Sequence, residues 1–326
     1  MTFTRRSFNV VAAASLAAGT NGLRAQNAYP TKPIRWIHGT PAGGGSDVLV
    51  RVVAEQLAKQ IQQPVLIENK PGAGTTIAAE YVARSPADGY TLLSADTGTL
   101  VFNAALYRKL SYEPAKDLQA IGMLAHFPLL LVAAPNGNFT TAASAIAAIR
   151  ANPGKYSCGT SGIGSPHHLA LELLKDDASL NLVHVPYKGG APSLQDVVAG
   201  VIPFAIVDSA TSAGMRAAGR LQVLASFTEG RVDVLPGVPT LIELGYLKSA
   251  APCWVAVVAP AGTPADIVAK LSTEVARAVG SAPVQKRLRE LGLQPQASTA
   301  AELREVWALA DKQWPPMIRA KGISVE

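Results

Sequence analysis

Short apolar runs alternate with longer stretches of helical spacing along this chain. The run Ile34–His38 predicts a buried strand, and Val65–Ile67 and Tyr90–Leu93 predict the next two. Between the first two strands the apolar residues recur every three or four positions: Leu49, Val52, Val53, Leu57 and Ile61. A second helix is predicted from about Thr76 to Arg84. Strands separated by single helices favour right-handed crossovers and parallel pairing.

A second unit of the same kind begins near Phe127. It opens with a strand at Leu129–Ala133 and a helix over 142–151. A strand at Tyr156–Cys158 then leads to a helix that Ser165 caps, with Pro166 at its first position. The elements predicted after it are strands at Val183–Val185, Phe204–Val207, Leu221–Ala225 and Trp254–Val258, helices at Leu194–Ala199 and Ser212–Ala218, and further helices to Ile318.

The C-terminal helices follow a second unit that is already complete, so they need another surface to pack on. The first unit has only three predicted strands and two helices between them, which makes it the partner. We therefore expect the chain to cross back. One lobe would combine residues 26–127 with 252–326, and the other would be 128–251. Two lobes joined by crossing segments enclose a cleft.

Residues 1–25 have the features of an export signal. Arg5 and Arg6 form a twin-arginine pair, and Val10 to Ala18 is an apolar stretch too short to span a membrane. Leu23-Arg24-Ala25 is an imperfect cleavage site, and export to the periplasm is the prediction. An ordinary amphipathic N-terminus is the alternative, and the route could be twin-arginine or general export. We expect no membrane-spanning segment in the mature chain.

Composition narrows the function classes. The formal net charge is +6, but three of those charges come from arginines in residues 1–25, which hold no acid. The balance is 26 basic against 23 acidic residues, without the basic run that would follow a nucleic acid backbone. Two cysteines, Cys158 and Cys253, are too few for a disulfide framework or a zinc knuckle. We expect two buried thiols, although a single bridge between them stays open.

Glycine-rich or polar loops follow several predicted strands. Gly43-Gly44-Gly45 lets the backbone approach a ligand closely, and Ser46 or Asp47 could cap the helix that follows. A helix start offers free N–H groups and a partial positive charge, which suit a carboxylate or phosphate. Loops 68–76, 94–99 and 159–165 lie at other strand ends, where open α/β sheets bind ligands. A tight turn without a ligand is the alternative for each loop alone.

Catalytic motifs are incomplete. Gly159-Thr160-Ser161-Gly162-Ile163 lacks the final glycine of G-x-S-x-G, no G-K-[ST] occurs, and the glycines do not fit a dinucleotide fingerprint. His168 and Glu172 have a metal-ligand spacing, but no dense cluster supplies a third ligand. His168 is better explained as a helix-start residue that donates to the backbone or to an anion. Asp47, Asp96 and Asp208 near strand ends are explained by capping. We expect binding without catalysis, and neither a cofactor nor a metal.

Several of these motifs together resemble the Bug family, the periplasmic substrate-binding proteins of tripartite tricarboxylate transporters. The matching segments span nearly the whole mature chain: Gly43–Asp47, Glu68–Gly74, Gly162–Ser165 with His168, Val185–Gly189, Leu235–Thr240 and Ala259–Pro264. The resemblance implies a two-lobed α/β fold of the type II periplasmic-binding-protein (Venus-flytrap) class, with a ligand cleft between the lobes. It also implies a small carboxylate ligand, delivery to a membrane permease, and no enzymatic activity. We further expect a monomer that binds no nucleic acid.

The resemblance places the ligand at strand-end loops of both lobes. The implied ligand-binding residues are Thr40, Ala42, Gly43, Gly44, Gly45, Ser46, Asp47, Asn69, Gly72, Ala73, Gly74, Thr75, Thr97, Thr160, Ser161, Gly164, Ser165, His168 and Asp208. Two departures from the family pattern stand out. Gly39-Thr40 replaces a proline followed by an aromatic, and Thr75 replaces a common glycine. Losing the aromatic removes a large cleft wall, which changes the shape of ligand that fits.

Three functions follow as hypotheses. The first is a receptor that captures a small carboxylate for a secondary uptake system. The second is a periplasmic hydrolase with Ser161 or Ser165 as nucleophile. The third is a sensory role, in which the liganded protein docks on a receptor ectodomain; its cleft would be the same as that of the first.

Overall fold

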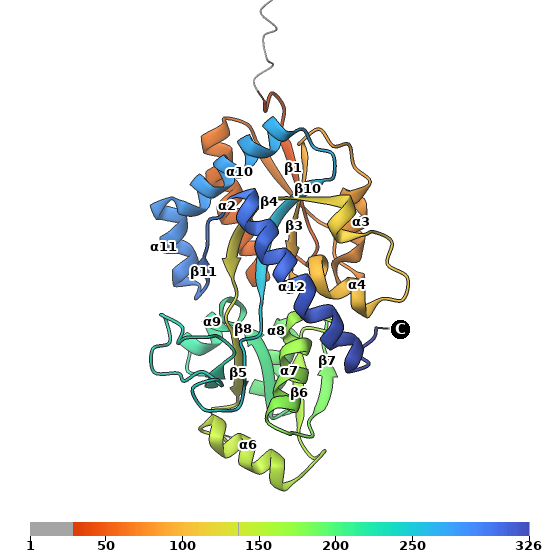
Figure 1. The fold of residues 1–326 in the computed structure, drawn as a ribbon. Coiled ribbons are helices and arrows are strands. Elements are labelled where there is room, and N and C mark those ends of the chain that lie inside the picture. The colour runs from red at the N-terminus through yellow and green to blue at the C-terminus, as the bar shows by residue number, and fades with distance from the viewer. Residues whose placement is uncertain (1–28, 136, 326) are drawn as a thin grey trace, which may run out of the picture. The chain divides into compact units, whose positions relative to one another are not determined.

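Two mixed sheets organise residues 29–135 and 137–325, which are the residues described by the computed structural model (Figure 1). Within these residues the first sheet has the order β11 (Gln294–Pro295), β4 (Leu118–His126), β10 (Trp254–Pro260), β3 (Thr91–Asp96), β1 (Ile34–His38), β2 (Val65–Asn69). The second has the order β7 (Val183–Pro186), β6 (Ser157–Thr160), β8 (Phe204–Asp208), β5 (Leu129–Ala133), β9 (Gln222–Ser226). The predicted export signal, 1–25, lies outside the described residues.

Helices accompany each sheet, and we call each sheet with its helices a lobe. The first lobe has α2 (Gly45–Ile61), α3 (Thr76–Ala83), α4 (Asn103–Leu106), α5 (Pro114–Asp117), α10 (Ala265–Gly280), α11 (Ala282–Glu290) and α12 (Ala300–Ala320), with a 3₁₀ turn η1 (Ala73–Thr75) and a π turn η2 (Gly98–Phe102). The second lobe has α6 (Ala142–Ala151), α7 (Pro166–Asp177), α8 (Gly190–Val198) and α9 (Ser209–Ala217). No described helix is both long and apolar enough to cross a membrane.

Parallel pairing holds only for part of each sheet. As predicted, β1 pairs in parallel with β2 and with β3, and β6 pairs in parallel with β7 and β8. The returning strand β10 runs antiparallel to both β3 and β4, and β5 runs antiparallel to β8 and β9. The expectation of a parallel sheet was therefore too simple, because a strand that arrives from the other lobe needs no helical crossover.

The chain passes between the sheets twice. Strands of the first sheet come from residues 34–126 and 254–295, and strands of the second come from residues 129–226. The lobe limits given above, 26–127 with 252–326 and 128–251, stay a prediction. Cys158 and Cys253 are both free and buried.

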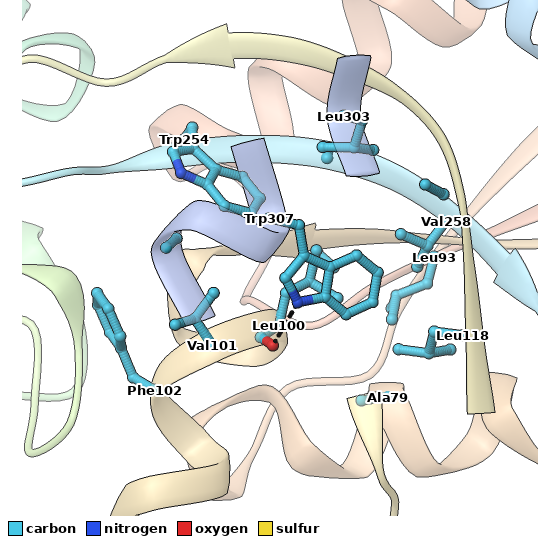
Figure 2. Close-up of a cluster of buried hydrophobic side chains, with 14 of the residues drawn as sticks. Ala79, Leu93, Leu100, Val101, Phe102, Leu118, Trp254, Val258, Leu303 and Trp307 are labelled. Atoms are coloured by element: carbon cyan, nitrogen blue, oxygen red, sulfur yellow. Dashed lines mark hydrogen bonds between the residues drawn. The ribbon is translucent and has the colours of Figure 1, made fainter. Parts of the chain in front are cut away.

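The core of the first lobe forms around two tryptophans (Figure 2). Trp254 on β10 and Trp307 on α12 are both buried, and the Trp307 indole Nε1 donates to the carbonyl of Leu100 at 3.0 Å. A buried indole N–H that finds an acceptor avoids the cost of an unmade hydrogen bond. This bond fixes α12 to the η2 turn, which follows β3 directly. The core of the first lobe thus positions the η2 turn beside the strand ends where the candidate site lies.

Candidate functional site

The loop after β1 is organised by a buried histidine that the sequence did not single out. His38 ends β1, is 3% exposed, and lies 2.6 Å from Ser94 Oγ and 2.7 Å from Thr40 Oγ1 through its two ring nitrogens. Ser94 also donates to the carbonyl of Ile37 at 3.3 Å. With its proton used there, Ser94 accepts from Nδ1 and Thr40 donates to Nε2. Burial lowers the pKa of His38, so the ring is neutral and orients Thr40.

A second group fixes the same loop from α2. Asn69 at the end of β2 donates to the carbonyl of Thr40 at 2.9 Å and to Asp47 Oδ1 at 2.8 Å. Asp47 also accepts from the Gly43 N–H and from Arg51, both at 2.9 Å. Burial raises the pKa of Asp47, but the hydrogen bonds from Arg51, Gly43 and Asn69 outweigh it and lower that pKa to about 2. Asp47 and Asn69, two predicted ligand contacts, therefore hold the loop in place.

Helix α2 begins without a side-chain cap. Gly44 is the N-cap, so the prediction that Ser46 or Asp47 would cap this helix was wrong. The helix starts earlier than expected, and Asp47 lies in its first turn, where its charge suits the helix dipole. The first N–H groups of an α-helix have no intrahelical acceptor. The structure therefore presents this helix start to whatever lies against it.

The loop after β2 has unusual backbone geometry. Gly72, Ala73, Gly74 and Thr75 all have positive φ, at 135°, 45°, 59° and 73°. For alanine and for a β-branched threonine this conformation is strained, and such strain persists only where surrounding contacts impose it. Tyr107 donates to the carbonyl of Ala73 at 2.8 Å, which is one such contact. Helix α3, which follows, also lacks a side-chain cap.

Helix α7, which follows the glycine loop after β6, is capped by Ser165 as predicted. Ser165 Oγ accepts from the His168 N–H at 3.2 Å and donates to the carbonyl of Gly162 at 2.7 Å. The sequence predicted that His168 donates to the backbone or to an anion. In the structure its Nδ1 instead accepts from the Gly164 N–H at 3.1 Å. Its ring stacks on His184 at 4.0 Å between centroids. Burial and the nearby Lys175 lower the pKa of His168 to about 4, so it is neutral.

The neighbouring His167 has a different environment, which the sequence did not indicate. Its Nδ1 lies 2.6 Å from Ser161 Oγ, and its Nε2 lies 3.8 Å from Asp208 Oδ2. Asp208 caps α9, as the sequence suggested, by accepting from the Thr211 N–H at 2.8 Å and the Thr211 hydroxyl at 2.6 Å. Burial raises the pKa of Asp208, but the nearby His167 and the bonds from Thr211 outweigh burial, so that pKa is lowered.

The two lobes meet at these loops. A Cβ on Gly45, at the start of α2, would lie 2.9 Å from Asp208 Oδ1 and 3.0 Å from Ala210 Cβ. The start of α2 in the first lobe therefore faces the start of α9 in the second lobe, with the Asp208 carboxylate between them. Elsewhere, a Cβ on Gly164 would lie 2.7 Å from Leu106 of the first lobe.

The remaining predicted residues divide by exposure. Thr97 is fully buried, and its hydroxyl accepts from the Trp254 N–H at 3.1 Å, so it ties β10 to the end of β3. Thr160 is also fully buried and lies 2.7 Å from His184 Nε2. Those on the exposed rim of the loops are Ala42, Gly43, Gly72, Ala73 and Gly74. Ser46 is half-buried, 3.1 Å from Thr40 Oγ1. Within the described residues no group of three or more His, Cys, Asp or Glu side chains could hold a metal.

The chain forms two α/β lobes, passes between them twice, and brings polar strand-end loops of both lobes together. This arrangement is typical of a two-lobed solute-binding protein. The chain belongs to the tripartite tricarboxylate transporter family receptors: a sequence model of that family matches residues 49–323. The resemblance stated from the motifs is thereby confirmed, and with it the function of an extracytoplasmic solute-binding receptor.

Named relatives and solved structures agree with this assignment. Protein BugT of Bordetella pertussis is 33% identical over 319 residues, covering 97% of this chain and 96% of that protein. The structure of R. palustris Rpa4515 with adipate is 32% identical, with a TM-score of 0.86 over 91% of this chain and 100% of that one. MatC from Rhodopseudomonas palustris with bound malate is 28% identical, with a TM-score of 0.80 over 89% and 100% of the two chains.

Proposed function

We propose that this protein captures a small organic carboxylate between its lobes and delivers it to the permease of a tripartite tricarboxylate transporter. The observation that carries the proposal is the start of α2, a helix without a side-chain cap that faces the second lobe. An anion there accepts from backbone N–H groups and meets the positive end of the helix dipole. The bound acids of two structural neighbours, adipate and malate, support the same chemistry.

The first lobe is the better seat for the carboxylate. In the second lobe, Ser165 and Asp208 already cap α7 and α9 with their own side chains. In the first lobe, α2 and α3 both lack such a cap, and the loops before them contain the residues predicted to bind the ligand, within 40–47 and 69–75. We infer that backbone N–H groups of these two loops hold the carboxylate of the ligand, and that the second lobe contacts the rest of the ligand. We also infer that residues 1–25 direct export and are removed, and that the mature receptor is a monomer.

The test is a ligand screen with a matched pair of variants. Thermal unfolding of the purified protein should shift upward with at least one aliphatic, aromatic or amino-acid carboxylate, because a ligand that binds the folded state stabilises it. Gly44→Val should abolish the shift: a Cβ at Gly44 has ordinary space, 3.9 Å from the nearest atom, but occupies the approach to the helix start. Gly280→Val, at the end of α10 with nothing within 4 Å, is the control and should respond like the native protein.

A flat response across all three classes of acid, or a full response in folded Gly44→Val, would contradict the proposal. If a carboxylate binds but its uptake does not depend on the permease of a tripartite tricarboxylate transporter, the sensory alternative replaces delivery to a permease.

Hydrolysis is the second candidate, because Ser161, His167 and Asp208 lie in line. The spacing differs from that of a working triad. The serine contacts Nδ1 rather than Nε2, and the carboxylate is 3.8 Å from the ring and already bonded twice by Thr211. A serine-directed fluorophosphonate probe should leave Ser161 unlabelled, and labelling of Ser161 would favour the hydrolase.

A further inference from the structure

One buried ring nitrogen of the second lobe has no hydrogen-bond partner within residues 29–135 and 137–325. The Nε2 of His167 is enclosed and unpaired among the described residues, and the residue is 9% exposed. Its other nitrogen is held by Ser161 at 2.6 Å, which fixes the ring with Nε2 toward Asp208. An unsatisfied buried polar atom is energetically unfavourable, so a group that satisfies it contributes to binding.

The gap between His167 and Asp208 suits one bridging oxygen. Nε2 and Oδ2 lie 3.8 Å apart, beyond hydrogen-bond distance, yet an oxygen placed about 2.8 Å from each can contact both. Asp208 Oδ2 accepts from the Thr211 hydroxyl and has lone-pair capacity for a second donor. The bridging group must therefore donate to a carboxylate and satisfy a ring nitrogen.

A hydroxyl meets both requirements. When Ser161 donates to Nδ1, the Nε2 carries the proton, and a hydroxyl can accept from Nε2–H while it donates to Asp208. A second carboxylate group only accepts, so Asp208 would repel it. An ammonium group only donates, and it would face the positive ends of α2, α7 and α9, which begin around this position.

We propose that His167 and Asp208 hold a hydroxyl group of the solute, so that the ligand is a hydroxylated carboxylic acid. The inference rests on the proposed function, because the carboxylate of the same molecule would lie at the open position beside Gly44, where a Cβ would be 3.9 Å from the nearest atom, and not at Gly45, which faces Asp208. The first lobe then recognises the acid group, and the second lobe selects for the hydroxyl. This selection uses His167, which none of the sequence motifs indicated.

The experiment compares acids that differ only by the hydroxyl. Calorimetric titration of the purified protein with malate against succinate, lactate against propionate, and 3-hydroxybutyrate against butyrate should find at least one pair in which the hydroxy acid binds about 10- to 100-fold tighter. His167→Leu should bring that ratio close to one and leave the affinity for the deoxy acid within about threefold. Asp208→Asn keeps an N-cap for α9 and should reduce the ratio.

A charge-matched control lies on the same lobe. Asp177, at the other end of α7, accepts from the Lys248 N–H, and Asp177→Asn should leave the ratio unchanged. Equal binding of the paired acids by the native protein would overturn the hydroxyl site without touching the carboxylate proposal, as would tighter binding of aspartate than malate. A ratio retained in folded His167→Leu would also overturn it. If no acid binds at all, the carboxylate proposal fails, and the hydroxyl site fails with it.

Discussion

Gly39 and Thr75, where the resemblance implies two departures from the family pattern, lie against each other in the structure. A Cβ on Gly39 would lie 2.9 Å from Thr75 Cβ and 3.0 Å from its Cγ2. The side chain of Thr75 therefore fills the space that a larger residue at position 39 would need. Thr75 also lies 2.6 Å from Thr99 Oγ1, which anchors it toward β3. The sequence alone does not connect Gly39 with Thr75, and the structure places Thr75 where a side chain at position 39 would lie.

This close contact predicts a strong energetic coupling between positions 39 and 75. Gly39→Ala alone should lower the free energy of unfolding by about 1–3 kcal/mol, because the new methyl group overlaps Thr75. In a Thr75→Gly background the same change should be close to neutral. Urea unfolding of the four proteins in a double-mutant cycle measures the coupling, expected at about 1 kcal/mol or more. Additive effects would show that Thr75 gives way and that the two positions are independent.

Asp47 makes a pH-dependent contribution to stability. Its pKa is about 2 in the folded protein against an ordinary value of 3.8, so folding favours the charged form. The contribution is complete above the unfolded pKa and is lost as the pH falls through the folded pKa. Asp47→Asn should therefore cost about 2 kcal/mol at pH 7 and progressively less toward pH 2. Glu55→Gln, in an exposed pair with Lys59 on the same helix, should leave the free energy of unfolding almost unchanged. Urea unfolding of both variants at pH 7, 4 and 3 tests this, and a constant cost for Asp47→Asn would contradict it.

The N-cap of a helix can affect ligand binding as well as stability when it also shapes a loop of the candidate site. Ser165 caps α7 and also bonds the carbonyl of Gly162, so it shapes the loop that holds Ser161. Thr141 caps α6 through a capping box, away from the loops where the lobes meet. Ser165→Ala and Thr141→Ala should each lower stability by about 1 kcal/mol. Only Ser165→Ala should also weaken carboxylate binding, as titration calorimetry would show. An equal effect of both caps on affinity would mean that the loop does not depend on its cap.

The sequence predicted helices and strands well where periodicity is local. Leu129–Ala133 and the helix over 142–151 appear as expected, and the two cap predictions at Ser165 and Asp208 are confirmed. Strand β4 was missed, since Gly122 interrupts its pattern. A Cβ there would lie 2.8 Å from the carbonyl of Ser298, a contact 176 residues away in the chain that periodicity does not contain.

The candidate site was harder to predict than the fold. The glycine loops could be found, because turns and helix starts carry local signals. The roles of individual side chains could not. His167 and His168 are adjacent, and which of them points toward Asp208 depends on where β8 lies beside α7. His38 was hidden for the same reason, since its partner Ser94 comes from a strand 56 residues further on. Side-chain networks of this kind are set by the assembled sheets.

For the whole molecule, the two lobes share part of one core through α7. Leu169 of this second-lobe helix is 2% exposed and belongs to the buried cluster of the first lobe that includes Trp314. Ile323 and Val325, after the end of α12, pack against the same cluster, and Lys321 forms an ion pair with Asp176. Figure 1 shows α12 running along the first sheet toward α7. The end of the chain therefore links the lobes when they are in contact.

This link predicts that a change far from the strand-end loops alters affinity. Leu169→Ala and Leu171→Ala remove the same atoms from one helix, and both residues are buried, but Leu171 lies outside the shared cluster. Each should lower stability by about 2–5 kcal/mol. Only Leu169→Ala should weaken carboxylate binding, by about tenfold. The apparent affinity of a ligand held by both lobes falls as the fraction of molecules with the lobes together falls. Hydrogen exchange should then rise at residues 314–325 in Leu169→Ala and stay unchanged there in Leu171→Ala. Equal affinities in the two variants would mean that the ligand contacts alone hold the lobes together, and that the shared core only supports folding.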